Sequence, residues 1–107
     1  MLNKSDLLVV IPAFNESETI NSVISDLLSL SFNILVIDNG STDGTGEIAS
    51  NLGVEVITNT NNSGYESSIN QGFKFALNND PKPLIFLCFF HEINDLQGFL
   101  LVNPLEK

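Results

Sequence analysis

The sequence has no arginine and four lysines, Lys4, Lys74, Lys82 and Lys107, against thirteen acidic residues, which gives a formal net charge of −9. This shortage of positive charge argues against nucleic acid or an anionic membrane surface as the main partner, because both attract basic proteins. It also means that a phosphate-bearing ligand has to be held mainly by backbone N–H groups, helix N-termini or a bound cation.

Cysteine and long hydrophobic runs are also scarce. Cys88 is the single cysteine, so an internal disulfide is excluded. The stretch from Met1 to Asp6 lacks the apolar core of a secretory signal, and we expect a cytoplasmic location by default. The longest uninterrupted apolar stretch, Leu84 to Phe90, is far shorter than the about 20 residues that a membrane helix requires, so we expect no membrane span.

The apolar residues fall into short periodic segments that are typical of a folded protein. With 107 residues, 43% of them hydrophobic, we expect one domain over residues 1–107 without linker or internal repeat. Apolar or β-branched runs predict strands at Leu7–Ile11, Asn33–Ile37, Val54–Ile57 and Leu84–Phe90.

Helical periodicity lies between these strands. The first predicted helix follows Ser17, the expected N-cap, and has Glu18 in its first turn. Its apolar residues recur on one helical face: Ile20, Val23, Ile24, Leu27 and Leu28. A second helix ends at Gly53, a third leads to Asn78, and Glu92–Val102 is interpreted as a last short helix. The alternation predicts a Rossmann-like three-layer αβα fold with a mainly parallel sheet.

Polar turns follow the first two predicted strands, at Pro12–Glu16 and at Asp38–Thr45. The carboxyl ends of neighbouring parallel strands meet at one edge of the sheet, where open α/β sheets bind ligands. A nucleotide-sugar site is therefore the first hypothesis. Two other phosphate-binding motifs are absent from the sequence. Gly40–Gly46 lacks the lysine of a P-loop, and no G-x-G-x-x-G follows the first strand.

Three segments together resemble the N-terminal half of family 2 glycosyltransferases, whose fold is called GT-A and whose donors are nucleotide-diphosphate sugars. These segments are Val9–Glu16, Val36–Thr45 and Asn62–Phe73. The match covers residues 7–87 and leaves residues 88–107 as a divergent tail. The resemblance implies a GT-A fold that is incomplete, because the half that supplies the acceptor contacts and the general base is not present.

The resemblance also implies a nucleoside pocket lined by Pro12, Phe14, Glu16, Asp38 and Asn39. The ring of Phe14 would lie near the base and the carboxylate of Glu16 near the ribose, where each has suitable chemistry. The family often has an aspartate after Asp38, and the amide of Asn39 leaves the preference for uracil undecided. Taken singly, Asp38 could instead cap its own loop, and Glu16 could be an exposed residue before the helix.

The family places an Asp-x-Asp motif at the end of the fourth strand, where Mg²⁺ or Mn²⁺ bridges the donor diphosphate. Here the tripeptide Cys88-Phe89-Phe90 stands in that place. Hard cations take oxygen ligands, which neither phenylalanine nor a neutral thiol supplies. We therefore expect no bound metal and no sugar transfer by this chain alone. His91 and Asp95 have helical i, i+4 spacing, but we interpret Glu92 and Asp95 as acidic residues at a helix start rather than as metal ligands.

The leading hypothesis is a truncated or degenerate family 2 glycosyltransferase that retains the half that binds the nucleotide-diphosphate sugar. Its intact relatives would transfer a sugar to a lipid-linked or saccharide acceptor. The first alternative is a non-catalytic interaction module or inert fragment, which would self-associate through apolar surface left bare beside the fourth strand. The second is a longer enzyme whose coding sequence is frame-disrupted near residues 88–90.

Overall fold

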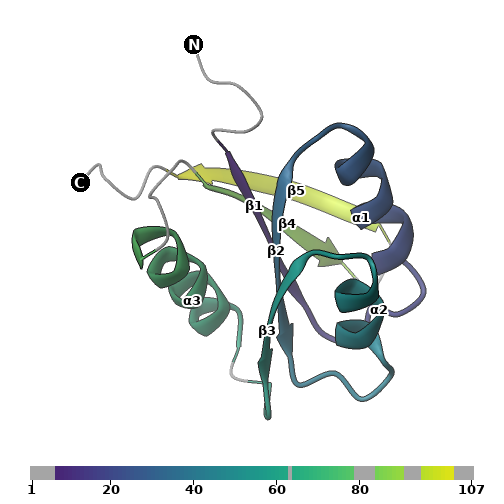
Figure 1. The fold of residues 1–107 in the computed structure, drawn as a ribbon. Helices are drawn as coiled ribbons and strands as arrows, with labels where there is room; N and C mark the ends of the chain where they lie inside the picture. Colours follow the sequence, from purple (N-terminus) through teal and green to yellow (C-terminus); the bar gives the residue numbers. More distant parts are fainter. Residues whose placement is uncertain (1–6, 63, 79–83, 91–94, 103–107) are drawn as a thin grey trace.

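The computed structural model describes residues 7–62, 64–78, 84–90 and 95–102. The chain alternates strands and helices up to its fourth strand and then adds a fifth strand (Figure 1). The elements are β1 (Leu8–Ala13), α1 (Ile20–Ser29), β2 (Asn33–Asn39), α2 (Thr45–Asn51), β3 (Glu55–Asn59), α3 (Tyr65–Asn78), β4 (Leu84–Phe90) and β5 (Asp95–Val102). The four predicted strands and the three helices between them are confirmed.

The strands form one sheet in the order β3-β2-β1-β4-β5. Strands β1 to β4 are parallel to their neighbours, whereas β5 pairs antiparallel with β4. Helices α1 and α2 cover one face of the sheet and α3 covers the other, as Figure 1 shows. This arrangement confirms the expected Rossmann-like αβα fold with a mainly parallel sheet.

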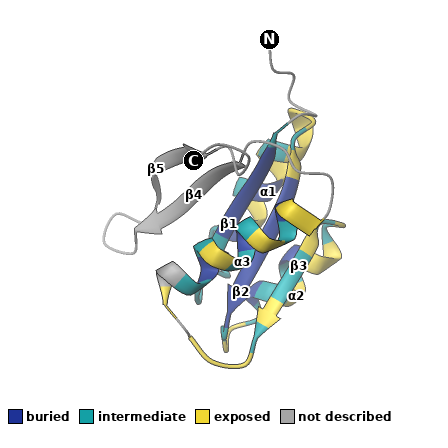
Figure 2. Cartoon of the chain, turned by 90° about the vertical axis from the view of Figure 1, so that its left-hand side faces the viewer, coloured by how far each residue is buried: buried dark blue, intermediate teal, exposed yellow. Residues whose placement is uncertain are grey.

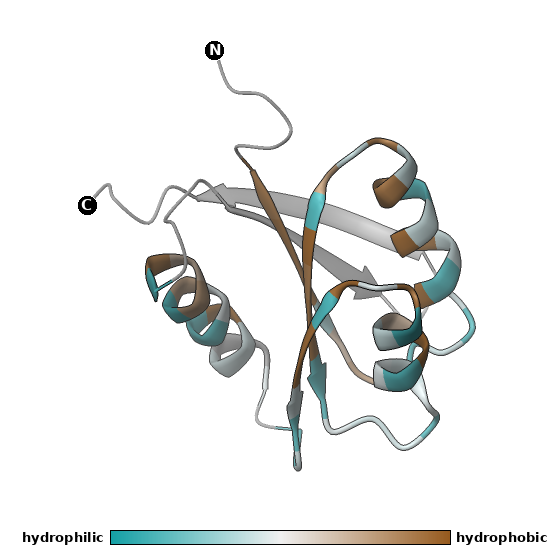
Figure 3. Ribbon diagram, viewed as in Figure 1, coloured by the Kyte–Doolittle hydropathy of each residue, from teal (hydrophilic) through white to brown (hydrophobic). Residues whose placement is uncertain are grey.

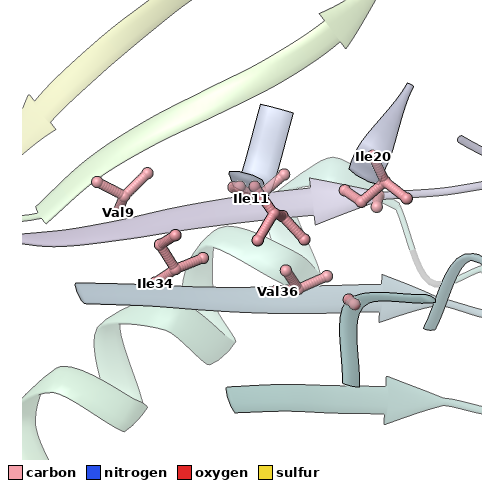
Figure 4. Packing of buried hydrophobic residues seen from close by; sticks show 8 residues of the cluster. Val9, Ile11, Ile20, Ile34 and Val36 are labelled. Carbon is pink, nitrogen blue, oxygen red and sulfur yellow. The ribbon is translucent and has the colours of Figure 1, made fainter. Parts of the chain in front are cut away.

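The core lies on both faces of the two central strands. Val9 and Ile11 of β1 face α1 and α2, while Val10 faces α3, because successive side chains of a strand point to opposite faces. Figure 2 shows β1 and β2 as mostly buried, and Figure 3 shows β1 and the middle of β2 as hydrophobic. Figure 4 shows Ile20 of α1 packed near the β1 side chains. Burial on both faces explains why these strands are uninterrupted apolar runs.

Helix α1 begins at Ile20, later than the sequence pattern predicts. Its N-cap is Thr19, whose side chain makes no capping hydrogen bond, and no acidic residue lies in the first turn. The expectations for Ser17 as N-cap and for Glu18 in the first turn are therefore wrong. Residues 17–19 form a turn instead, in which the backbone N–H groups of Thr19 and Ile20 both donate to the carbonyl of Glu16.

The expected helix at Glu92–Val102 is also wrong, because Asp95–Val102 is strand β5. The N–H and C=O groups along an edge strand need partners, and antiparallel pairing supplies them to β4 where a helix could not. Strand β4 is consequently covered on that side, in contrast to the bare strand that the interaction-module hypothesis assumed. His91 and Glu92 lie outside the described residues. No helix in the described part of the chain has both the length and the apolar character needed to span a bilayer.

Candidate functional site

The two polar turns singled out in the sequence leave the sheet side by side. In the register of β1 and β2, Pro12 is aligned with Ile37, and Ala13 with Asp38. The loop after β1 and the loop after β2 therefore start at the same edge of the sheet, at its lower end in Figure 1. This edge is formed by the carboxyl ends of the parallel strands, the usual ligand-binding edge of such sheets.

Asn15 ties the loop after β1 to the loop after β2 in both directions. Its backbone N–H donates to Ser41 Oγ over 2.9 Å, and its side-chain Oδ1 accepts the backbone N–H of Thr42 over 2.9 Å. Asn15 adopts φ 55°, in the left-handed region that asparagine tolerates better than most residues. The two loops are thereby held together as one unit.

Thr45, the first residue of α2, anchors the next part of the same loop. Its hydroxyl accepts the backbone N–H of Glu16 over 2.9 Å, and the Thr45 residue is fully buried. Glu16 itself is 7% exposed, so the interpretation of this residue as an exposed neighbour of the helix is wrong. The acidic residue Glu16 is thus buried and fixed just after the carboxyl-terminal end of β1.

Asp43 completes this anchor as an acceptor of several hydrogen bonds. Its Oδ2 accepts the backbone N–H of Ser17 over 3.1 Å, and its Oδ1 accepts the backbone N–H and the hydroxyl of Thr45. Burial alone would raise the pKa of Asp43, but the hydrogen bonds from Thr45 and Ser17 favour the charged form and together lower the pKa to about 2. Asp43 is therefore a carboxylate that stabilises the loop.

Asp38, at the end of β2, also holds its own loop. Its Oδ1 accepts the backbone N–H of Ser41 over 3.0 Å, and the residue is only 5% exposed. A Cβ atom on Gly46 would lie 3.2 Å from Asp38 Cγ, so α2 packs directly against this carboxylate. Asp38 therefore caps its loop in this structure, as the alternative interpretation proposed.

Asn39 joins the ends of β2 and β3. The two strands align Asn39 with Asn59, and Asn59 Nδ2 donates to Asn39 Oδ1 over 3.0 Å. Asn39 Nδ2 donates to Asn62 Oδ1 over 2.8 Å and to the carbonyl of Gly64 over 3.3 Å. The amides of Asn59 and Gln71 of α3 exchange two hydrogen bonds of 2.8 Å each. This amide network is uncharged and connects two strands, a loop and a helix.

The structure thus brings the five predicted site residues to one edge of the sheet in two environments. Glu16, Asp38 and Asn39 are buried, whereas Pro12 and Phe14 are half-buried. The sequence reasoning assigned no site role to four residues that organise this edge: Thr45, Asn59, Asn62 and Gln71. A signal existed for Asn59 alone, because a polar residue at the end of β3 faces the polar residue at the end of the neighbouring strand β2.

A pocket of about 330 Å³ lies elsewhere on the molecule. It is lined by Leu8, Asn33 and Val54, at or just before the starts of β1, β2 and β3, together with Phe32 and Phe75 among others. These strand starts are at the opposite edge of the sheet from the interlocked loops. The pocket is therefore not part of the candidate site.

The donor chemistry of Cys88–Phe90, at the end of the fourth strand, does not fit a Mg²⁺ or Mn²⁺ site. Cys88, Phe89 and Phe90 are part of β4, and the backbones of Phe89 and Phe90 are paired with those of Leu96 and Asp95 of β5. Neither a thiol nor a phenylalanine ring offers the oxygen ligands that these cations need. Among the side chains that the structure describes, no group of three or more His, Cys, Asp or Glu residues comes together.

The fold and the polar edge define a Rossmann-like α/β domain. The chain belongs to the glycosyl transferase family 2, whose family model matches residues 8–90. This family membership and the GT-A fold confirm the resemblance found in the sequence.

Two relatives and one solved structure illustrate the similarity. An uncharacterized protein of Methanocaldococcus jannaschii is 40% identical over 85 residues, which cover 78% of this chain and 35% of that protein. The dolichol-phosphate mannosyltransferase of Pyrococcus furiosus is 37% identical over 76 residues, covering 64% of this chain and 22% of that protein. The chain thus spans only 22–35% of the length of these relatives.

The solved structure is glucosyl-3-phosphoglycerate synthase from Mycobacterium tuberculosis in complex with Mn²⁺, uridine diphosphate and phosphoglyceric acid. It is 26% identical in sequence with a TM-score of 0.62, over 77% of this chain and 32% of that chain. A structural neighbour with the same half-fold therefore binds a nucleoside diphosphate together with a cation.

Proposed function

We propose that this chain is the donor-binding half of a family 2 glycosyltransferase and binds a nucleotide-diphosphate sugar at the carboxyl edge of β1 and β2. The observation that carries the proposal is the fixed position of Glu16. Its backbone is held by Thr45, and its carboxylate residue is buried at the ligand-binding edge of the sheet. A fixed carboxylate at this edge is suited to accept hydrogen bonds from the hydroxyl groups of a ligand.

The half-buried ring of Phe14 and the carboxylate of Glu16 supply the two contacts that a nucleoside needs. An aromatic ring stacks on the base, and a carboxylate accepts hydrogen bonds from ribose hydroxyls. Support also comes from the solved neighbour, whose structure is a complex with uridine diphosphate and which shares this half of the fold. In this proposal Pro12 shapes the pocket wall, and Asp38 keeps the loop on the other side of the base in place.

The same proposal predicts nucleotide binding without catalysis by this chain. The chain has no arginine, and the residues at the end of β4 are not ligands for a hard cation. Stabilisation of a diphosphate leaving group rests on such a cation. One relative is a dolichol-phosphate mannosyltransferase, and we propose a lipid-linked or saccharide acceptor for the intact enzyme.

Calorimetric titration of the purified chain with uridine and guanosine diphosphates, each with and without Mn²⁺, tests this function. We expect saturable binding of at least one nucleotide, with an affinity that Mn²⁺ does not change. Phe14→Ala should weaken that binding about 5-fold or more, because base stacking contributes about 1–3 kcal/mol. Glu16→Gln should weaken it as well, whereas Glu18→Gln, at an exposed position in the same loop, serves as the matched control.

Two results would contradict the proposal. If neither nucleotide binds saturably to the folded chain, the donor-binding function is wrong. If binding requires Mn²⁺, the claim that the chain lacks a cation site is wrong.

The alternative function, a non-catalytic interaction module, has less support in the structure. That hypothesis needs an unpaired fourth strand, and β5 pairs with β4 from Leu84 to Phe90. Sedimentation analysis of the chain tests it directly. A monomer that binds no hydrophobic dye would remove the alternative, and a tight dimer would restore it.

A further inference from the structure

We infer that Asn39 is a positioning residue, which holds the loop containing Asn62 and Gly64 against the end of β2, and that it does not select the base of the nucleotide. The part of the inference that concerns the base rests on the proposed function. The residue stands where family 2 sequences often have an aspartate, and in this chain its amide is engaged by the protein itself.

The orientation of the Asn39 amide follows from its partners. The carbonyl of Gly64 can only accept, so the group that faces it has to be the amide nitrogen of Asn39. Asn62 Oδ1 already accepts the backbone N–H of Gly64 over 3.0 Å, which identifies it as an oxygen and again requires a donor from Asn39. Both N–H bonds of the Asn39 amide are therefore used within the protein.

The oxygen of the same amide is held from the other side. Asn59 Nδ2 donates to it over 3.0 Å, and Asn59 is itself locked by two hydrogen bonds with Gln71 of α3. Asn39 is 5% exposed. A base that used this amide as a donor would have to displace Asn62 and Gly64 from it.

The loop that Asn39 holds is packed closely on the backbone at the end of β2. A Cβ atom on Gly40 would lie 2.9 Å from the carbonyl carbon of Asn61 and 2.9 Å from the backbone nitrogen of Asn62. Gly40 also has φ 86°, which favours glycine. The close backbone contact and the hydrogen bonds of Asn39 thus position the same loop from two sides.

An aspartate at position 39 would not fit this arrangement. A carboxylate only accepts, so it would turn an oxygen toward Asn62 Oδ1 and the carbonyl of Gly64 and lose both donated hydrogen bonds. The asparagine is thus matched to the chemistry of its own loop, independently of the base. This match explains a departure from the family pattern that the sequence alone left undecided.

A double-mutant cycle on the thermal unfolding of the full chain tests the positioning role. We expect Asn39→Asp to lower Tm by about 10 °C, because two hydrogen bonds are lost and a charge is buried. Asn39→Ala and Asn62→Ala should be non-additive, so that the second substitution lowers Tm less when the first is present. Asn39→Ala combined with Asn51→Ala, an exposed asparagine of α2, should be additive and serves as the control. Additive effects of Asn39→Ala and Asn62→Ala would overturn the positioning role.

The ratio of uridine to guanosine diphosphate affinities tests the part that concerns the base. We expect Asn39→Ala to weaken both nucleotides by the same factor and to leave the ratio unchanged within about 2-fold. A change of about 10-fold or more, the discrimination that one direct hydrogen bond can give, would overturn it. If the unsubstituted chain binds neither nucleotide, both the proposed function and the claim about the base are wrong. The double-mutant cycle on unfolding still tests the positioning role in that case.

Discussion

Gly46, in the first turn of α2, lies directly against the carboxylate of Asp38 at the end of β2, so that a Cβ atom at position 46 would stand 3.2 Å from Asp38 Cγ. The contact brings the helix and the strand together at the edge that carries the candidate site. Asp38 in turn caps the loop between them through the backbone N–H of Ser41. A glycine is thus needed at position 46 for space, and the first prediction concerns this contact.

Gly46→Ala should destabilise the fold by about 1–3 kcal/mol, because an overpacked contact forces the Asp38 side chain away from Ser41. Urea unfolding measures the change in the free energy of unfolding. In the background of Asp38→Ala the same glycine substitution should cost clearly less, because the clashing carboxylate is gone. An equal cost in both backgrounds would show that the contact is not the cause.

Thr45→Val should destabilise the chain by about 1–3 kcal/mol in the same urea assay. The substitution keeps the shape of the side chain but leaves the buried N–H of Glu16 without its acceptor and removes a donor to Asp43. Thr45→Ser should retain most of the stability, since it keeps the hydroxyl. Thr42→Val, at an exposed position in the same loop, is the matched control and should change little. Similar losses at positions 42 and 45 would contradict this role of Thr45.

Asp43 should make the stability of the chain depend on acid pH. Its pKa is lowered from 3.8 to about 2 in the folded state, so the stabilisation is fully present above about pH 4 and is lost as the pH falls toward 2. The contribution should stay below about 1 kcal/mol, because solvent screens an exposed carboxylate.

The measurement for Asp43 is urea unfolding at several pH values for the unsubstituted chain and for Asp43→Asn. The difference in the free energy of unfolding between the two proteins should shrink between pH 4 and pH 2. This comparison cancels the titration of the other carboxylates. A difference that is constant with pH would be inconsistent with the lowered pKa.

Ser31→Gly should stabilise the chain by about 0.5–1 kcal/mol. Ser31, which follows the C-cap Leu30 of α1, has φ 69°, a left-handed conformation that glycine adopts without strain. The backbone N–H of Ser31 donates to Leu28, and that of Phe32 to Leu27, as in a Schellman motif. Thermal unfolding provides the measurement. Gly53→Ala, at φ 89° after α2 and with open space around the added Cβ, is the reverse control and should destabilise by a similar amount.

The strands up to β4 could be predicted from their short apolar runs, and for β1 and β2 burial on both faces explains this pattern. Leu84–Phe90 has the same bounds in the structure as in the sequence prediction, and the strand that starts at Asn33 extends past Ile37 to Asn39. Asp38 and Asn39, the polar residues that end the second strand, have low intrinsic strand propensity. They are nevertheless held in the ladder by pairing with β3.

The two errors in the elements have different causes. Ser17 has the composition of an N-cap, but residues 17–19 form a turn and α1 starts at Ile20. The sequence predicts a helix at Glu92–Val102, but Asp95–Val102 is a strand because it pairs with β4. Local propensity differs between such alternatives by less than the hydrogen bonds of one loop or ladder contribute.

For the candidate site, the amino-acid sequence alone predicts the residue types and their place at the strand ends. It also shows that no carboxylate stands at the end of β4. The tertiary structure alone assigned the partners of Glu16 and Asn39. The hydrogen bonds to Thr45 and Asn62 span 29 and 23 residues of sequence. Such pairs meet only once the sheet register is set, because local sequence carries no information about which polar groups the neighbouring loops bring within hydrogen-bonding distance.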